Sequence, residues 1–500
     1  MTVRTAPVDT EEASASAAHI PPASQPFSSV SRRTCQAIAG TVAVILLLAG
    51  GRWVSHIMIG PVYITDVLLA AAVLHMVCSR LLAKHHLGIN HGPGVLVGLV
   101  VFATLVRVIP SEGEALLIAR DAAPFLYVAV AYLSARGYLL ASEPDRRRTA
   151  RLVHGALGIH LCWVACVVLV PGLSSALSEF WSGPSPEVRS DLDTALLGIL
   201  AGVSILRFRR KEATWMSALL AGASVALALT MHSRAGLLAC CICVVAALAG
   251  GVDRNARASV RTVALGMSAV VLLIVLLPSS PAAQRLIATV DQGAASQALA
   301  VSAGGTSNAR KVAWERVIRF TLDDPARVMI GVGFGPDFLK DADADVALGS
   351  KTYQGVRSPH NYLVTVFARL GLLGLIMIAA LLAAVLAAAI RELRARHQPD
   401  ELTFMCVFMV MSLLVIAMLG VVLESPFGAV PFFWAGGVLL ARRHRRRRSP
   451  AGTAHVVPSV RYRRPRLIEA PPESAGSLAL VAESAPVLSM EPTARAVHQR

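Results

Sequence analysis

The stretch Arg357-Ser358-Pro359-His360-Asn361 contains the side chain best suited to proton transfer. Serine is a favoured helix N-cap and proline suits the first helical position, so Ser358-Pro359 predicts that a helix begins here. His360 would then lie in the first turn, where the free N–H groups and the helix dipole disfavour an imidazolium ion. With an arginine nearby, we expect His360 to be neutral near pH 7, as a general base must be. The alternative is a histidine that only closes a loop.

Two arginines stand at unusual places. Arg120, followed by Asp121, lies inside an apolar segment, where a charge is expensive and normally marks a site or an internal pair. Arg234 begins another apolar segment. If Arg234 has no functional role, its side chain simply extends its charge to the membrane surface. If Arg120 has none, it forms a structural ion pair with Asp121.

The amino-acid composition indicates the class of protein that positions these residues. Hydrophobic residues make up 55% and charged residues 16% of the 500 residues, and the mean hydropathy is +0.60. Ordinary soluble chains have about 25% charged residues. The apolar residues fall in blocks of about 20, the helix length that crosses a bilayer. These values exclude a soluble enzyme and a disordered protein, and 8 Cys do not make a disulfide scaffold. The sequence predicts an all-α polytopic membrane protein.

We expect about twelve transmembrane helices within a domain over residues 32–441. The predicted spans cover residues 35–54, 61–79, 93–110, 114–135, 151–171, 191–207, 213–230, 235–252, 262–280, 360–390, 401–422 and 427–441. The span at 360–390 is long, and Gly371 and Gly374 are places where it can bend.

The basic residues set the orientation. With the N-terminus inside, the inner loops carry 17 Lys and Arg, whereas the short outer loops carry only Arg52, Arg189 and Arg234. This is the positive-inside pattern, so both termini are expected to be cytoplasmic. Residues 1–31 and 442–500 are predicted to be disordered cytoplasmic tails. The second tail holds 12 Arg and 4 Glu. Because its basic run directly follows a span, we expect it to contact anionic membrane lipids and not nucleic acid.

One loop, residues 281–359, is long and lies outside. Loops of this length are usually functional. Within it, residues 307–320 predict an amphipathic helix on the outer membrane surface, with Ser307 as N-cap and Asp323-Asp324-Pro325 as its end. The polar stripe of this helix is Lys311, Glu315 and Arg319, and the other side carries Arg310, Trp314, Val317 and Ile318.

Other polar features carry weaker signals. Gly331-Val-Gly333-Phe-Gly335 predicts a tight turn that brings backbone close to another segment. Glu424, at an outer turn, is a candidate to supply a carboxylate, although a solvated loop acid is the simpler interpretation. The eight cysteines lie in or beside spans, and the Asp341-Ala-Asp343-Ala-Asp345 run lacks the later residues of a calcium loop. We therefore expect no metal and no cofactor.

The order of these motifs resembles the O-antigen ligase/polymerase family of bacterial envelope glycan assembly. The resemblance covers about residues 230–390 and rests on Ser233-Arg234-Ala235-Gly236, Arg310, Trp314, Gly331-x-Gly333-x-Gly335, His360-Asn361-x-Leu363, Gly371 and Gly374. It implies the membrane glycosyltransferase type C fold in the bacterial inner membrane, with the active site on the extracytoplasmic face. The donor would be a glycan on undecaprenyl pyrophosphate. The acceptor would be a hydroxyl on lipid A–core in a ligase, or on another lipid-linked glycan in a polymerase.

The residues suit metal-independent transfer of this kind. A departing pyrophosphate develops negative charge, and arginine makes forked contacts with phosphate oxygens. The hypothesis assigns Arg234 and Arg310 to this clamp, with Arg120 as a third member, and His360 as the base that takes the proton of the acceptor. For Trp314 two roles are open, packing on a sugar face or anchoring its helix in the membrane interface. Asn361 is also expected to bind substrate.

Two alternatives stay open. A twelve-span secondary transporter is the main rival, although no internal repeat joins the two halves. A different membrane glycosyltransferase would use an acidic first outer loop, and the stretch from Arg52 to Pro61 has no carboxylate. The sequence does not separate ligase from polymerase.

Overall fold

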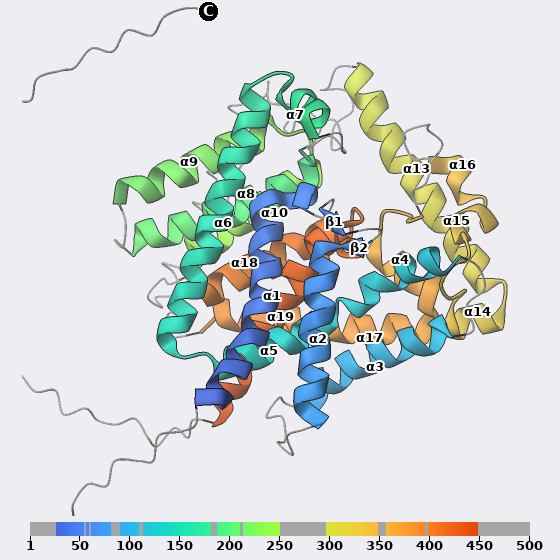
Figure 1. The fold of residues 1–500 in the computed structure, drawn as a ribbon. Coiled ribbons are helices and arrows are strands. Elements are labelled where there is room, and N and C mark those ends of the chain that lie inside the picture. Colours follow the sequence, from blue (N-terminus) through green and yellow to red (C-terminus); the bar gives the residue numbers. More distant parts are fainter. Residues whose placement is uncertain are drawn as a thin grey trace, which may run out of the picture. The chain divides into compact units, whose positions relative to one another are not determined.

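The computed structural model describes residues 27–54, 57–59, 62–81, 91–109, 114–181, 188–210, 214–250, 297–348, 357–395 and 399–448. Most of these residues are helical (Figure 1). The strands among them are β1 (Met58–Ile59) and β2 (Val62–Tyr63), an antiparallel pair in which Met58 faces Tyr63. The expected all-helical architecture is confirmed, with this short hairpin as an addition.

The helices follow the predicted spans closely. Before the long loop they are α1 (Phe27–Val54), α2 (Ile64–Leu81), α3 (His91–Val108), α4 (Ala115–Leu126), α5 (Ala129–Leu140), α6 (Glu143–Leu169), α7 (Leu173–Trp181), α8 (Ser190–Arg209), α9 (Thr214–Thr230) and α10 (Arg234–Ala249). Within it lie α13 (Gln297–Leu322), α14 (Pro325–Ile330), α15 (Phe338–Asp341) and α16 (Ala344–Leu348), and after it come α17 (Tyr362–Leu393), α18 (Glu401–Ala417), the 3₁₀ turn η2 (Val422–Glu424) and α19 (Pro426–Arg448).

Few of the described helices are long enough to cross a membrane on their own. By length and composition, α6 and α17 are long and apolar enough to cross a membrane, and the pair α4 and α5, bent by 41°, makes a third if it is one span. The predicted span at 262–280 lies outside the described residues. Twelve crossings therefore remain a prediction.

Three of the helix bounds that differ from the expected ones concern the tails and the long loop. Helix α1 begins at Phe27, so the last residues of the expected tail are helical. Helix α19 continues through the basic run to Arg448, because arginine is a good helix former. Helix α13 begins at Gln297, which makes Ser307 an interior residue and not its N-cap. Residues 1–26 and 449–500 lie outside the described residues.

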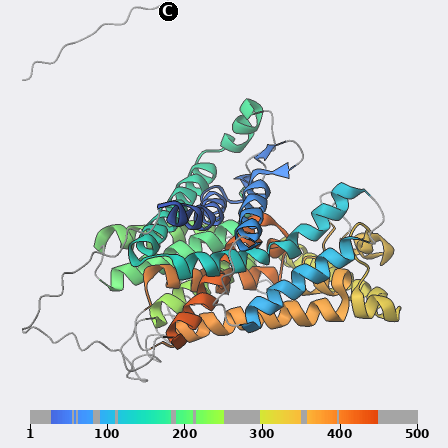
Figure 2. The same cartoon turned by 60° about the horizontal axis from the view of Figure 1, so that its bottom comes forward.

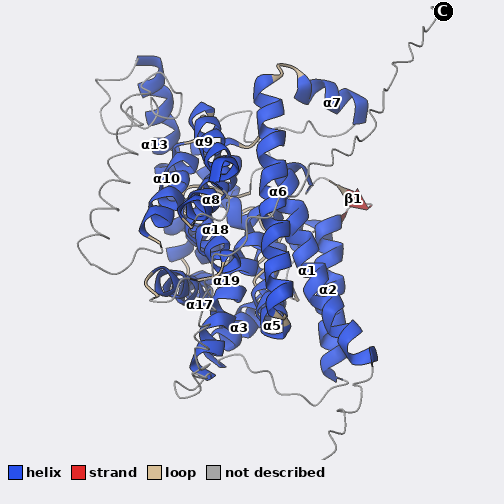
Figure 3. Ribbon diagram, turned by 90° about the vertical axis from the view of Figure 1, so that its left-hand side faces the viewer, coloured by secondary structure: helices blue, strands red, loops and turns tan. Residues whose placement is uncertain are grey.

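Helix α18 is the centre of the bundle. It packs against α8, α10, α17 and α19 (Figure 3). Nearly all of its residues are buried, which is expected of a helix that is apolar on every side. Glycine permits the close approach of α8 to α10 beside it, because a Cβ on Gly198 would lie 2.5 Å from the Cα of Cys240.

Polar contacts hold one end of this bundle together. Arg442 of α19 pairs with Glu392 of α17 at 3.0 Å and with Asp400, the N-cap of α18. Arg210, at the end of α8, donates to the carbonyl of Pro399. These residues lie at the helix ends that the charge pattern assigns to the cytoplasmic side.

Helix α17 is kinked where a glycine loop meets it. Gly371 has φ 64° and ψ −163°, so the helix breaks there and frees the carbonyls of Ala368 and Arg369. The N–H groups of Val332 and Gly333 donate to these two oxygens at 2.8 and 3.0 Å. The adjoining helix α14 lies along the first part of α17, where yellow meets orange in Figure 2. The expected bend at Gly371 is confirmed, and so is the close backbone approach of the glycine turn.

Candidate functional site

His360 lies in a turn just before α17, and not inside the helix as the Ser358-Pro359 pattern predicted. The N-cap is Asn361, whose side-chain oxygen accepts from the N–H groups of Leu363 and Val364. The Ser358 hydroxyl accepts from the N–H of His360, two residues on, and donates to Glu424, but the helix starts only at Tyr362. His360 itself has a left-handed backbone with φ 60°.

Two helices hold this turn in place. Trp314 of α13 donates its indole N–H to the carbonyl of Pro359 at 2.6 Å. The Asn361 amide donates to the carbonyl of Met418, at the end of α18. A left-handed backbone costs a residue with a side chain roughly 1–2 kcal/mol. These contacts offset that cost and fix the position of the imidazole.

The surroundings of His360 keep it neutral. His360 is buried, with 8% of its surface accessible to solvent. Burial, with the nearby charges of Arg310 and Arg189, lowers the pKa of His360 to about 4. The expected neutrality is confirmed, but its cause is burial and two cations, since the histidine precedes the first turn of the helix.

Arg310 reaches the same region from α13. It stands one helical turn before Trp314, so the two side chains share a face. Its guanidinium donates to the carbonyl of Leu419 at 2.7 Å, next to the residue that Asn361 contacts. The exposed stripe of Lys311, Glu315 and Arg319 lies on the other side of α13, as predicted.

Arg234 is the first residue of α10, capped by the Ser233 hydroxyl. The backbone at Gly236 packs on the first turn of α8, where a Cβ would lie 3.0 Å from the carbonyls of Ser190 and Asp191. Asp191 in turn lies beside Gly420, just after α18. The first turns of α8, α10 and α17 therefore gather around the end of α18. Helix N-termini carry partial positive charge and favour anions.

The comparison with protein families falls on this same group of residues. Residues 218–379 match the family model described as O-antigen ligase. This segment is an O-antigen ligase domain. The expected resemblance is confirmed over about a third of the chain, and with it the expectation of an enzyme. No curated protein matches the chain.

The ligase domain contains most of the predicted site. Arg234, Arg310, Trp314, His360 and Asn361 all lie within it. The family implies a membrane protein that acts on lipid-linked O-antigen and lipid A–core. Among the described residues, no group of three or more His, Cys, Asp and Glu side chains is placed to hold a metal ion.

Arg120 lies outside the ligase domain, on the exposed side of α4. Its neighbour Asp121 contacts the site through ion pairs. The Asp121 carboxylate is 6% exposed and pairs with Arg357 at 3.0 Å and with Arg369 at 2.7 Å. Arg357 stands three residues before His360, so α4 braces the turn through the acid. The role of Arg120 in substrate binding stays a prediction.

Arg189 and Asp191, near the turn, escaped prediction, and Glu424 carried only a weak signal. Glu424 is not the solvated loop acid that we expected. One of its oxygens accepts from the Ser358 hydroxyl at 2.8 Å and from the Thr365 hydroxyl at 3.0 Å. Its position after a span was the only signal in the sequence, because its partners are 59 and 66 residues away.

Glu424 should make stability depend on pH. Burial raises the pKa of Glu424 from 4.5 to about 7, so the folded protein keeps a proton that the unfolded chain releases. This contribution to stability is full below pH 4.5 and is lost as the pH rises through about 7. Glu424→Gln keeps an oxygen for both hydroxyls and removes the titration. We expect the melting temperature of the wild type, relative to this variant, to fall by a few degrees between pH 5 and 8. Parallel melting curves in detergent would contradict the assignment.

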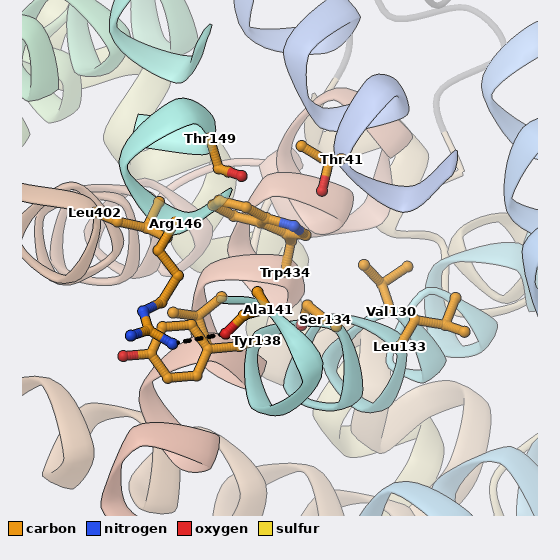
Figure 4. A pocket seen from close by; sticks show the side chains of 12 residues that line it. Thr41, Val130, Leu133, Ser134, Tyr138, Ala141, Arg146, Thr149, Leu402 and Trp434 are labelled. Atoms are coloured by element: carbon orange, nitrogen blue, oxygen red, sulfur yellow. Dashed lines mark hydrogen bonds between the residues drawn. The ribbon is translucent and has the colours of Figure 1, made fainter. Parts of the chain in front are cut away.

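A cavity of about 60 Å³ lies elsewhere in the bundle, among α1, α5, α6, α18 and α19 (Figure 4). Its lining includes Tyr138, Arg146 and Trp434, and Arg146 donates to the carbonyl of Ala141. Leu402 lines it at the start of α18, whereas the His360 turn meets the other end of that helix. None of the predicted site residues lines this cavity.

Proposed function

We propose that the protein transfers a glycan from an undecaprenyl pyrophosphate carrier to a sugar hydroxyl, on the extracytoplasmic face and without a metal ion. The observation that carries the proposal is the meeting of α13 with the His360 turn. Arg310 and Trp314 contact the end of α18 and the turn itself, next to the imidazole whose pKa Arg310 lowers. These residues lie in the O-antigen ligase domain, which disfavours the transporter alternative.

The chemistry assigns one role to each group. The acceptor oxygen attacks the anomeric carbon of the donor, and the bond from that carbon to the pyrophosphate oxygen breaks. The electron pair of this bond stays on the pyrophosphate, where Arg310 and Arg234 stabilise the growing negative charge. His360, being neutral, takes the proton of the acceptor hydroxyl. Arg120 remains a further candidate for the clamp.

Positioning is the role of two other side chains. The indole N–H of Trp314 is bonded to Pro359, which supports anchoring of the turn over stacking on a sugar. Asn361 caps α17 and contacts α18, which supports the same role. The gathering of helix ends around α18 supports the alternating topology, with the site on the outer face.

Arg310→Ala is expected to lower transfer by roughly 10²–10³-fold, the loss typical of one donor to a developing anion. The assay uses protein in liposomes with a lipid-linked oligosaccharide donor, and offers lipid A–core and a lipid-linked glycan as separate acceptors. The preferred acceptor distinguishes ligase from polymerase.

Arg319→Ala is the matched control, because Arg319 lies on the exposed side of α13 and pairs with Glu315 at the surface. It should retain near wild-type transfer. The same assay in chelator should show full activity. Wild-type rates in Arg310→Ala, or dependence on added Mg²⁺ or Mn²⁺, would contradict the proposal.

A further inference from the structure

Arg189 stands at the start of α8 near Asp191, which lies beside Gly420 just after α18, and Arg189 has no role in the proposal above. It is the N-cap residue of α8 and precedes the ligase domain in the sequence. Its charge contributes, with that of Arg310, to keeping His360 neutral, and it acts on Glu424 as well. Its guanidinium also stacks on Phe427, three residues after Glu424. Arg189 therefore faces the site from a fourth element.

The guanidinium of Arg189 is held in a fixed orientation. Its Nε donates to the Asp191 carboxylate at 2.9 Å, and its Cζ lies 5.3 Å from the centre of the Phe427 ring. The backbone N–H of Arg189 donates to Asp193 at 2.6 Å. An arginine held in this way loses little further freedom when it binds a ligand.

The two terminal nitrogens of this guanidinium are still available. Among the described residues, the hydrogen bonds of the Arg189 side chain are made by Nε alone. The side chain is 21% exposed, so Nη1 and Nη2 can be reached from outside the protein. A guanidinium that presents these two donors matches two oxygens of a phosphate group.

We propose that Arg189 is a further ligand of the carrier diphosphate, which it binds through Nη1 and Nη2, with Asp191 and Phe427 as its positioning residues. This inference rests on the proposed function, because it assigns the diphosphate to the same site. Together with Arg234 and Arg310, it gives the diphosphate three arginines from three elements. Asp191 compensates one of these charges, which leaves a net excess of positive charge for an anionic ligand.

The anchoring alone does not make a phosphate site, and Arg327 shows why. Its Nε contacts Asp324 at 3.2 Å and its Cζ lies 4.1 Å from the centre of the Phe320 ring. Arg327 thus has the same kind of ion pair and ring stack, but it stands on α14 and not beside the His360 turn. It is the matched control for Arg189.

The test measures donor binding in the liposome assay, with Arg189→Gln and Arg327→Gln side by side. For Arg189→Gln we expect the KM for the lipid-linked donor to rise at least about tenfold and kcat/KM to fall roughly 10²-fold, with the KM for the acceptor unchanged. Added undecaprenyl pyrophosphate should inhibit this variant more weakly than the wild type. Arg327→Gln should match the wild type in all of these values.

Asp191→Ala separates ligand binding from support of the fold. It keeps the arginine and frees its Nε, so the donor KM should rise less than in Arg189→Gln. A lowered melting temperature in Arg189→Gln, with wild-type donor KM in Asp191→Ala, would overturn the inference in favour of a structural role. Wild-type donor KM and product inhibition in Arg189→Gln, with transfer lost in Arg310→Ala, would overturn it and leave the proposed function standing. Wild-type transfer in both arginine variants would contradict the proposed function itself.

Discussion

Replacing His360 by asparagine is expected to lower the rate of glycan transfer by roughly 10²–10⁴-fold, the usual contribution of a general base. Asparagine is the right replacement because it tolerates the left-handed backbone that His360 adopts, whereas alanine adds strain at φ 60°. The variant removes the imidazole and keeps the turn. Its melting temperature should therefore stay close to that of the wild type, while transfer from the lipid-linked donor is lost.

The comparison with His360→Ala makes the test sharper. Both variants lack the base, so both should be inactive, but only the alanine variant should also be less stable. Wild-type turnover in His360→Asn would remove the base assignment. Equal loss of stability in both variants would show that the imidazole supports the fold and would leave its catalytic role without support.

The pH dependence of the rate follows from the surroundings of His360. In the free enzyme the imidazole titrates near pH 4, because burial and the charges of Arg310 and Arg189 disfavour its protonated form. Bound diphosphate would offset these two charges and raise the pKa of His360. The acid limb of kcat should therefore lie at higher pH than that of kcat/KM, because the first reports the complex and the second the free enzyme. The profile is best measured in Glu424→Gln, which removes the group that titrates near 7.

The charge bias of the sequence placed Arg234, Arg310 and His360 near outer helix ends. In the structure the first turns of α10 and α17 lie near the end of α18, which Arg310 of α13 also contacts. The sequence could not predict the turn itself. Ser358-Pro359 and Asn361 are both good starts for a helix, and the partners that hold Asn361 and the Ser358 hydroxyl, Met418 and Glu424, lie 57 and 66 residues away.

The predicted fourth span shows a similar limit. The apolar pattern over residues 114–135 indicates one helix, and the structure has α4 and α5 with a bend of 41° between them. Pro124 lies inside α4 and cannot donate to the carbonyl of Arg120, which weakens the helix in the turn that precedes the bend. Pro124 is visible in the sequence, but the continuous apolar pattern favoured the prediction of a single helix. The pairing of Asp121 with Arg357 and Arg369 had no local signal, because these partners follow more than 230 residues later.

Gly371→Ala is expected to destabilise the protein by about 2–5 kcal/mol, the sum of a left-handed alanine and an overpacked contact. Gly371 has φ 64°, and a Cβ there would lie 2.4 Å from the carbonyl carbon of Met329 and 2.5 Å from the nitrogen of Ile330. These are backbone atoms and cannot turn aside as a side chain would. Thermal unfolding in detergent measures the effect. Gly222→Ala in α9 is the control, because a Cβ there meets nothing within 4 Å and alanine favours a helix.

Gly331→Ala should act on the same contact from the other side. Its Cβ would lie 2.3 Å from the carbonyl carbon of Arg369, and Gly331 has φ 70°. Either substitution forces the glycine loop away from α17 and leaves the carbonyls of Ala368 and Arg369 without their donors. Once the loop has moved, the second substitution has little contact left to disrupt. The double variant should therefore lose clearly less stability than the sum of the two single losses. Additive losses would mean that each glycine serves only its own backbone conformation, and that the kink in α17 does not depend on the loop.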